Sequence, residues 1–277
     1  MKSLKLLPAI VLLFLAACAA PATPAPSPTT VPPKAIPTSE PTAMPTAIPS
    51  VTITYEEYAQ VELVTPTGRH IYIDVSTANI PYLTQAPTAE DVLLTTHLHS
   101  DHVDADFQSK FPGQQLYTQE GKIELPDVTI TGMASAHNTN DPIQSEGATD
   151  YIYIIDVAGL RIAHFGDIGQ EALTDTQLAT LGKVDVAITQ LSNNYSDMNA
   201  INKKGFNLMD QVKPRLIIPT HSDKATIQMA AERWKGYYSD SRTVIVSADN
   251  LPSETSLLAL GALAPSYGVL FKLAPWK

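Results

Sequence analysis

The most informative stretch of this chain is Thr95-Thr96-His97-Leu98-His99-Ser100-Asp101-His102. It directly follows Val92-Leu93-Leu94, a short apolar run typical of a buried strand. Three imidazoles and a carboxylate within six residues would make an unfavourable surface loop, but imidazole nitrogens and carboxylate oxygens are good ligands for divalent metal ions. The stretch therefore predicts a metal site at the end of a buried strand.

Three more residues of ligand type lie downstream, each where a strand should end. His137 follows the apparent strand 128–131, and Asp167 ends a predicted hairpin strand. His221 closes the apolar segment Ile217-Ile218-Pro219-Thr220. From such positions, side chains on different strands can converge on one point.

Together these segments resemble the ligand motifs of the metallo-β-lactamase superfamily, over about residues 51–261. The resemblance implies an α+β fold, a four-layer αββα sandwich in which helices cover two sheets. It also implies two divalent metal ions, with zinc expected and manganese or iron as alternatives, because histidine and carboxylate accept all three. The ligands that it implies are His97, His99 and His137 for the first ion, Asp101, His102 and His221 for the second, and Asp167 as a bridge. The alternative is that some of these histidines cap helices or pack in the core.

A dinuclear centre of this kind predicts hydrolysis. Two adjacent cations lower the pKa of a shared water and polarise a carbonyl or phosphoryl oxygen, which supplies a nucleophile without Ser or Cys. Asp101 is the predicted catalytic residue, because its carboxylate can orient the attacking water and carry a proton to the leaving group. We therefore expect a metal-dependent hydrolase of a small-molecule ester, lactone, phosphoester or amide. The rival interpretation is a catalytically inactive lipoprotein that binds a metal or ligand on the same fold.

Within the superfamily, the chain most resembles the L-ascorbate-6-phosphate lactonase-like branch. The resemblance rests on Gly166-Asp167-Ile168-Gly169, Val184-Asp185-Val186-Ala187-Ile188 and Lys213-Pro214-Arg215. The chain departs from that branch at Tyr58-Ala59-Gln60, where Gly-His-Ala is usual, and at Asp74-Val75, where Asp-Pro is usual. These departures leave the substrate open.

Polar residues on two loops beside the predicted ligands are candidate substrate contacts. They are Asn138, Asn193, Asn194 and Tyr195. The alternative is that they form solvated turns, for which asparagine is well suited. Outside the ligand set, His70 is predicted to be solvated at a strand start. His164 is predicted to pack in the interior, with a hydrogen bond to a ligand as the alternative.

The first residues of the chain indicate export and membrane anchoring. Lys2 and Lys5 precede an apolar run of about 12 residues, which suits a secretory signal and is too short to span a bilayer. The run ends in Leu15-Ala16-Ala17-Cys18, which resembles a bacterial lipobox, so Cys18 is the predicted lipidation site. The alternative is an ordinary signal peptide with an incidental thiol at this position.

A spacer should follow the anchor. Ten of the 22 prolines fall within 21–50, so this segment should be extended rather than folded, and it could hold a domain up to roughly 90 Å from the membrane. We therefore divide the chain into a signal peptide at 1–17, a lipidated Cys18 with a Pro/Thr/Ala-rich linker at 18–50, and a metallo-β-lactamase-like domain at 51–277. That domain should lie outside the cytoplasm, anchored to a bacterial membrane.

Composition limits the partners and the ligand chemistry. The formal net charge of −10 disfavours nucleic acid, because phosphates are bound largely by Lys and Arg. The expected partners are a small-molecule substrate and, through the lipid, a membrane. Since Cys18 is the one cysteine of the chain, the domain has neither a disulfide nor a thiolate metal ligand.

Hydrophobic periodicity predicts the secondary structure. Strands are expected at 51–54, 61–64, 70–74, 92–95, 128–131, 151–156, 160–165, 184–188, 215–219 and 243–247. Helices are expected at 171–181, 205–212 and 224–234.

Overall fold

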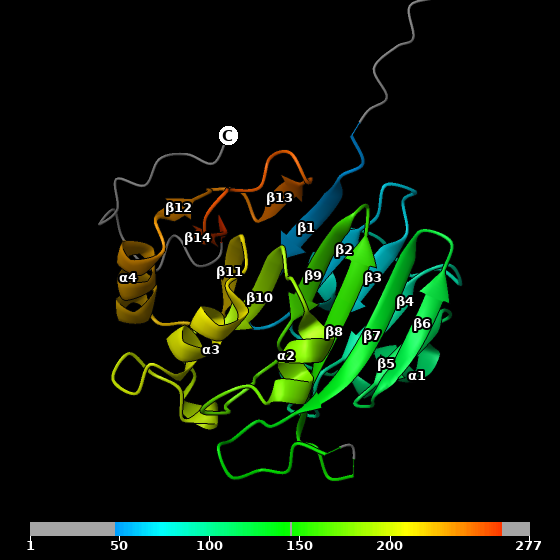
Figure 1. Ribbon diagram of the computed structural model, residues 1–277. Coiled ribbons are helices and arrows are strands. Elements are labelled where there is room, and N and C mark those ends of the chain that lie inside the picture. Colours follow the sequence, from blue (N-terminus) through cyan, green and yellow to red (C-terminus); the bar gives the residue numbers. More distant parts are fainter. Residues whose placement is uncertain (1–47, 145, 262–277) are drawn as a thin grey trace, which may run out of the picture. The chain divides into compact units, whose positions relative to one another are not determined.

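The computed structural model of the protein describes residues 48–144 and 146–261 (Figure 1). The predicted signal peptide at 1–17, the lipidation site Cys18 and nearly all of the linker at 18–50 lie outside the described residues. Residues 262–277 of the predicted domain at 51–277 also lie outside them, so this division of the chain stays a prediction. None of the helices within the described ranges is both long and apolar enough to cross a bilayer.

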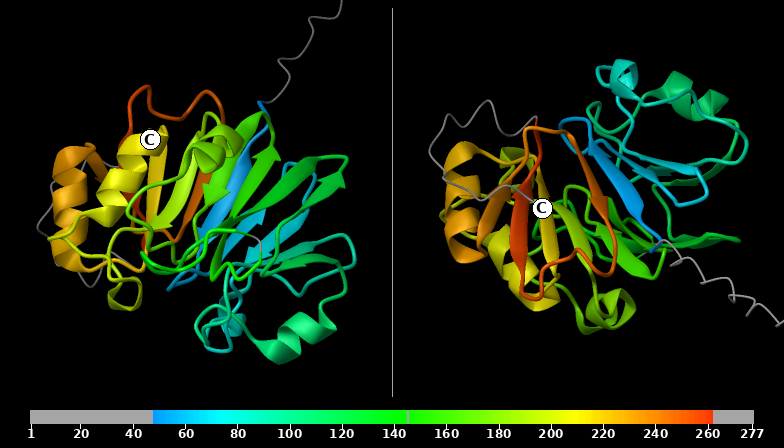
Figure 2. Two further views of the ribbon diagram at one scale, coloured as in Figure 1. Left: turned by 60° about the horizontal axis from the view of Figure 1, so that its bottom comes forward. Right: turned by 90° about the horizontal axis from the view of Figure 1, so that it is seen from above.

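Two β-sheets form the framework of the described residues (Figures 1 and 2). The first sheet has the order β13 (Thr243–Val246), β1 (Val51–Tyr55), β2 (Val61–Val64), β3 (His70–Ile73), β4 (Val92–Thr95) and β5 (Gln114–Tyr117). The second sheet has the order β12 (Gly236–Tyr238), β14 (Ser256–Ala259), β11 (Leu216–Thr220), β10 (Val186–Gln190), β9 (Leu160–His164), β8 (Asp150–Val157), β7 (Val128–Ser135) and β6 (Gly121–Leu125).

Helices cover the outer face of each sheet. The first sheet carries the 3₁₀-helix η1 (Ile80–Tyr82) and α1 (Ala105–Lys110), and the second carries α2 (Asp175–Leu181), α3 (Lys204–Val212) and α4 (Lys224–Arg233). A further 3₁₀-helix, η2 (Asn194–Ser196), follows β10. On the first sheet, the Phe107 and Phe111 rings meet Tyr72 edge-on at 6.3 and 5.9 Å. The predicted α+β, four-layer arrangement is confirmed.

The main core lies between the two sheets, and alternation along the strands selects its residues. In β3, Ile71 and Ile73 join this core, whereas Tyr72 faces the outer helices. In β4, Leu94 joins the core and Leu93 faces outward. Each fully buried Leu or Ile contributes about 1.5–3 kcal/mol by leaving water. Because a shift of one residue would exchange the two faces, this pattern fixes the strand register and hence where each strand ends.

The strand directions place several strand ends at one edge. β9, β10 and β11 are parallel neighbours, and β7 runs in the same direction because β8 is antiparallel to both β7 and β9. The loops that leave β7, β9, β10 and β11 therefore start at the same edge of the second sheet.

Every predicted strand and helix occurs, although several ends differ. The helix predicted at 171–181 begins only at Asp175, because Thr174 and Gln177 form a capping box that fixes its first turn. The strand predicted at 184–188 lies at Val186–Gln190. The elements that were not predicted are η1, η2, α1, β5, β6, β12 and β14. Among these, β5, β6 and β12 lie at sheet edges, where one side of the strand is unpaired and the apolar pattern is weak.

A buried polar network lies on the outer face of the first sheet, and it corrects the prediction for His70. Glu62 projects away from the core and is only 1% exposed, because the backbone N–H of Thr84 from the covering loop donates to its carboxylate at 2.9 Å. His70 pairs with Glu62, stacks on Tyr72 at 5.8 Å and is 8% exposed. The prediction of a solvated His70 is therefore wrong, because sequence periodicity does not reveal that a loop covers this face.

Glu56 adds a second buried carboxyl group to this network. Its side chain accepts a 2.6 Å hydrogen bond from the Gln60 amide, and Gln60 in turn accepts the backbone N–H of Ser76 at 2.9 Å. Burial raises the pKa of Glu56 to about 8, and the Glu62 carboxylate adds to the increase while the Gln60 bond opposes it. Near neutral pH, the folded protein therefore holds a proton on Glu56 that the unfolded chain has lost.

Glu56→Gln should stabilise the protein increasingly as the pH rises from about 5 to 8. In that window the folded state of the wild type binds more protons at Glu56 than the unfolded state, so its stability falls with pH by up to about 1.4 kcal/mol per pH unit from this group. The neutral amide removes that dependence. The measurement is urea unfolding of both proteins at several pH values with metal content held constant.

The matched control is Glu232→Gln, which removes an exposed carboxylate on α4. Its stability relative to the wild type should not depend on pH in this window, because water solvates the carboxylate in both states. A stability difference between Glu56→Gln and the wild type that is constant from pH 5 to 8 would contradict the prediction.

Candidate metal centre

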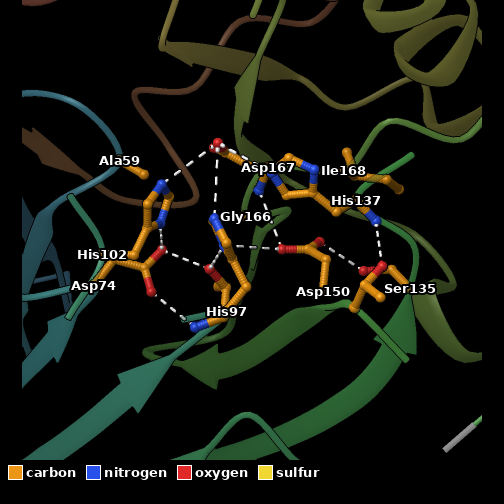
Figure 3. A network of polar contacts seen from close by, with 12 residues as sticks. Ala59, Asp74, His97, His102, Ser135, His137, Asp150, Gly166, Asp167 and Ile168 are labelled. Carbon is orange, nitrogen blue, oxygen red and sulfur yellow. Dashed lines mark hydrogen bonds and ion pairs between the residues drawn. The ribbon is translucent and has the colours of Figure 1, made fainter. Parts of the chain in front are cut away.

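All the predicted ligands lie at one edge of the two sheets, on loops that follow strands. Residues 97–102 follow β4 of the first sheet, and the other three segments follow β7, β9 and β11 of the second. The structure brings together His97, His99, Asp101, His102, His137, Asp167 and His221. Figure 3 shows His97, His102 and His137 grouped around the Asp167 carboxylate.

Three imidazoles form the first ligand group. His97, His99 and His137 each offer a nitrogen, and these atoms lie within 4.8 Å of one another. Their ring centroids are separated by 4.6 Å for His97 and His99, 4.7 Å for His99 and His137, and 4.9 Å for His97 and His137. His97 and His137 are buried and His99 is exposed, so the group opens toward solvent on one side.

The second group combines two imidazoles with a carboxylate. The ligand atoms of Asp101, His102 and His221 also lie within 4.8 Å of one another. The His221 Nε2 atom is 3.6 Å from Asp101 Oδ2 and 3.3 Å from His102 Nε2. His102 is fully buried, whereas the Asp101 side chain is 37% exposed.

Asp167 lies between the two groups and contacts both. Its Oδ2 is 3.4 Å from His102 Nε2, 3.8 Å from His137 Nε2 and 3.9 Å from His97 Nε2, and its Oδ1 is 3.6 Å from His221 Nε2. Burial alone would raise the pKa of Asp167, but the adjacent His102 and His137 hold it well below its usual range. The carboxylate is therefore ionised and positioned to bridge.

Burial also sets the charge of the imidazoles. It lowers the pKa of His97 to about 4, with His102 adding to the decrease, and it likewise lowers the pKa of His221. At neutral pH both rings are uncharged and offer a lone pair to a cation. For His102, burial acts in the same direction, but Asp74 and Asp167 outweigh it and raise the pKa well above its ordinary value. Cation binding should therefore release a proton from His102.

Buried ligand-type atoms without hydrogen-bond partners indicate that this set of residues fits metal ions. Within the described residues, His97 Nε2, His137 Nε2 and Asp167 Oδ1 are buried and have no hydrogen-bond partner. A buried polar atom without a partner costs about 1–3 kcal/mol, so three at one point require another explanation. Nitrogen and carboxylate oxygen are what a divalent metal ion coordinates, and these residues fit one.

Asp74 supports the ligands from behind, and the sequence analysis did not identify it. Its Oδ2 is 2.9 Å from His102 Nδ1, and its Oδ1 accepts the backbone N–H of Thr96 at 2.7 Å. A carboxylate on Nδ1 leaves Nε2 of His102 directed at the site and increases its basicity. The available signal was a carboxylate directly after the apolar strand Ile71-Tyr72-Ile73, where an ion needs a partner.

Asp150 is a second supporting carboxylate that was missed. It is fully buried at the start of β8, its Oδ2 accepts from Ser135 Oγ at 2.6 Å, and its Oδ1 lies 3.5 Å from His97 Nδ1. The backbone N–H of Asp167 also donates to it at 3.2 Å. Burial raises the pKa of Asp150 well above its usual range. No motif marks this residue, since its role depends on strand pairing between β7 and β8.

His164 is fully buried, as the packing prediction requires, but it also makes polar contacts. Its Nε2 lies 3.0 Å from the Ala59 carbonyl oxygen, and its Nδ1 accepts the backbone N–H of Gly166 at 3.2 Å. It therefore holds the backbone next to Asp167.

The four candidate substrate contacts differ in where they lie relative to the ligands and the adjacent cavity. Asn193 donates to Asp167 Oδ2 at 2.7 Å, which places its amide among the ligands. Asn138 and Tyr195 line a cavity of about 520 Å³ next to His97, His99 and His137. Asn194 is exposed and does not line that cavity. Contact with a substrate stays a prediction for all four.

Residues 52–221 match the family model described as the beta-lactamase superfamily domain. This chain belongs to the metallo-β-lactamase superfamily. The matched region covers more than half of the chain and contains every candidate ligand of the superfamily site. No curated protein sequence matches the chain.

Solved structures support the same fold. A protein from Thermotoga maritima, described as a Zn-dependent hydrolase of the superfamily, has 19% identity and a TM-score of 0.54, covering 76% of this chain and 99% of its own. A protein from Parabacteroides distasonis, described as a metal-dependent hydrolase, has 18% identity and a TM-score of 0.51, covering 66% and 88%. The metallo-beta-lactamase fold protein YhfI from Bacillus subtilis has 12% identity and a TM-score of 0.51, covering 76% and 97%. At these identities the likeness shows the fold alone.

Asp74→Asn should weaken metal binding by about 10- to 100-fold, because the neutral amide no longer supports His102 through Nδ1. The measurement is competition between metal-stripped protein and a chromophoric chelator for Zn²⁺. Asp249→Asn, on an exposed loop after β13, is the control and should bind as the wild type does. Unchanged affinity in Asp74→Asn would show that this carboxylate does not support the site.

Proposed function

We propose that this protein is a hydrolase that uses two divalent cations, with zinc as the expected metal, to cleave a small-molecule ester, lactone, phosphoester or amide. The observation that supports it is the overlap of three groups of ligand atoms, each within 4.8 Å, which share His97 and His102. Groups that share members in this way favour two neighbouring cations over one.

The cations, when bound, would lower the pKa of water toward neutrality and polarise the oxygen of the scissile group. The chain's own residues have separate tasks around that chemistry. The carboxylate of Asp101, which is 37% exposed, is the acid–base group that reaches solvent. This carboxylate would accept a proton from the attacking water and return it to the leaving group. The amide of Asn193 fixes Asp167 at 2.7 Å, so the buried carboxylate keeps its orientation during turnover.

The resemblance to the lactonase-like branch makes lactones, which are cyclic esters, one of the substrate classes in this proposal. Gly166-Asp167-Ile168-Gly169 and Lys213-Pro214-Arg215 support it. The alternative, a binding protein that has kept the ligands but lost turnover, predicts metal uptake without catalysis.

Metal-stripped protein should be inactive and should regain hydrolysis with Zn²⁺ or Mn²⁺ on a panel of lactone, aryl ester, phosphodiester and amide substrates. His97→Ala and Asp167→Ala should lower kcat/KM by roughly 10²-fold or more, because each removes a ligand from the centre. Asp101→Asn should lower kcat by about 10²- to 10⁴-fold through loss of the proton acceptor.

Asp106→Asn, which alters an exposed carboxylate on α1 outside the ligand groups, is the control for these variants. Residual rates that are equal in the wild type, His97→Ala and Asp167→Ala would identify the alternative, a metal-binding protein without turnover.

We further propose that the protein is exported and anchored through lipid on Cys18, outside the cytoplasm. Lys2, Lys5 and the apolar run ending in Leu15-Ala16-Ala17-Cys18 support this location. Cys18→Ser should abolish fatty-acid incorporation and move the protein from the membrane to the soluble fraction, because the thioether cannot form. Ser27→Ala, in the linker, should leave both unchanged. Absence of labelled fatty acid on the wild type would refute the anchor.

A further inference from the structure

We infer, as a refinement that rests on the proposed hydrolase function, that the substrate is an uncharged carboxylic ester, lactone or amide with an apolar part, not a phosphoester or another anion. In this reaction the water oxygen bonds to the acyl carbon, and the bond from that carbon to the leaving oxygen or nitrogen breaks. One water proton passes to the leaving group and the other is released with the acid product. The cavity beside the first ligand group supports this class of substrate.

The cavity has the size of a small-molecule site but lacks cationic side chains. Its volume of about 520 Å³ lies next to His97, His99 and His137. Among the described residues that line it, none is Lys or Arg. Phosphate and carboxylate groups are normally held by such side chains, through charge-assisted hydrogen bonds. An anionic substituent would therefore have no basic partner along this wall.

The charged residue that does line the cavity has the opposite sign. Asp141 Oδ2 accepts the backbone N–H of Asn138 at 3.1 Å and the Thr149 hydroxyl at 2.8 Å. A negative charge on this wall repels anions and tolerates neutral groups.

Lys204, which contacts the loops that carry Thr139 and Asp197, has its charge balanced by carboxylates. The Lys204 side chain is 2% exposed, and its Nζ lies 2.7 Å from Thr139 Oγ1, 3.2 Å from Asp197 Oδ2 and 3.6 Å from Glu171 Oε1. The ammonium group is thus paired with two carboxylates and one hydroxyl. Lys204 therefore connects loops and does not offer its charge to a substrate.

Exposed apolar and aromatic side chains, and not cationic ones, lie where the cavity opens to solvent. Leu98 lies between two candidate ligands and is 59% exposed, and Tyr195 is 80% exposed with its ring 6.4 Å from the His99 ring. Both line the cavity. Large apolar side chains left in water at a cavity mouth are typical of a site that binds an apolar group.

Hydrogen bonds connect the backbone of Tyr195 to the candidate ligands. Its backbone N–H donates to Asn193 Oδ1 at 2.9 Å, and the Asn193 amide donates to Asp167 Oδ2 at 2.7 Å. The backbone of Tyr195 is thus linked to the ligands through one intervening residue, and its ring lies 6.4 Å from the His99 ring. This makes Tyr195 a specificity-determining residue for the apolar part of the substrate.

A matched pair of amides tests the inference through binding as well as turnover. The probes are N-(4-nitrophenyl)butanamide and N-(4-nitrophenyl)succinamic acid, which differ by a terminal methyl and a carboxylate. Calorimetry at pH 8 measures both with Zn²⁺-loaded and with metal-free protein, so that a carboxylate cannot gain affinity by binding a cation. We expect the neutral probe to bind at least tenfold more tightly than the anionic one in the metal-free form.

Three variants sharpen this test. Tyr195→Ala should lower the affinity for the neutral probe by about five- to tenfold. The control Tyr82→Ala should leave that affinity unchanged, because Tyr82 is an exposed residue of η1 that does not line the cavity. Tyr195→Arg should shift the relative affinity toward the anionic probe by about tenfold.

The outcomes separate this inference from the proposed function. Equal or tighter binding of the anionic probe to the metal-free wild type overturns the inference, whether or not the protein is a hydrolase. Preference for the neutral probe, with loss in Tyr195→Ala, supports it. If that preference holds and no member of the lactone, aryl ester, phosphodiester and amide panel is cleaved with Zn²⁺ or Mn²⁺, the hydrolase proposal fails while the binding site stands.

Discussion

A buried carboxylate surrounded by four imidazoles is the interaction on which the rest of the site depends. Asp167 is 2% exposed, and its oxygens lie within 3.9 Å of nitrogens of His97, His102, His137 and His221. Partnerless nitrogens and a buried ion are unfavourable in a protein interior. Divalent cations would satisfy these atoms together, so metal binding and the stability of this edge of the fold are coupled.

The backbone around Asp167 permits this arrangement only because two glycines flank it. Gly166 has φ +54°, and a Cβ there would lie 2.3 Å from Asp150 Oδ1. A Cβ on Gly169 would lie 2.1 Å from the His137 carbonyl oxygen. Any side chain at either position would push apart the ends of β7, β8 and β9. The sequence Gly166-Asp167-Ile168-Gly169 is thus a packing requirement of the site as well as a family motif.

The convergence of the candidate ligands was predictable because their segments follow strands that the sequence indicates without reference to distant contacts. His97 after β4 and His221 after β11 are examples, since both strands are continuous apolar runs. The supporting residues were not predictable in the same way. Asp150 acts on His97 only through the pairing of β7 with β8, and His70 is buried only because a loop covers the first sheet. Such contacts join segments whose separation in sequence carries no local signal.

The mouth of the cavity is governed by different constraints from the metal centre. Strand ends fix the ligands, whereas the mouth is formed by loops, and the ammonium of Lys204 ties them together through Thr139, Glu171 and Asp197. Loop side chains such as Tyr195 can change without altering strand register or the ligand atoms. A family motif that encodes the centre therefore carries little information about the substrate, because nothing in that motif fixes the charge and polarity of the loops around the cavity.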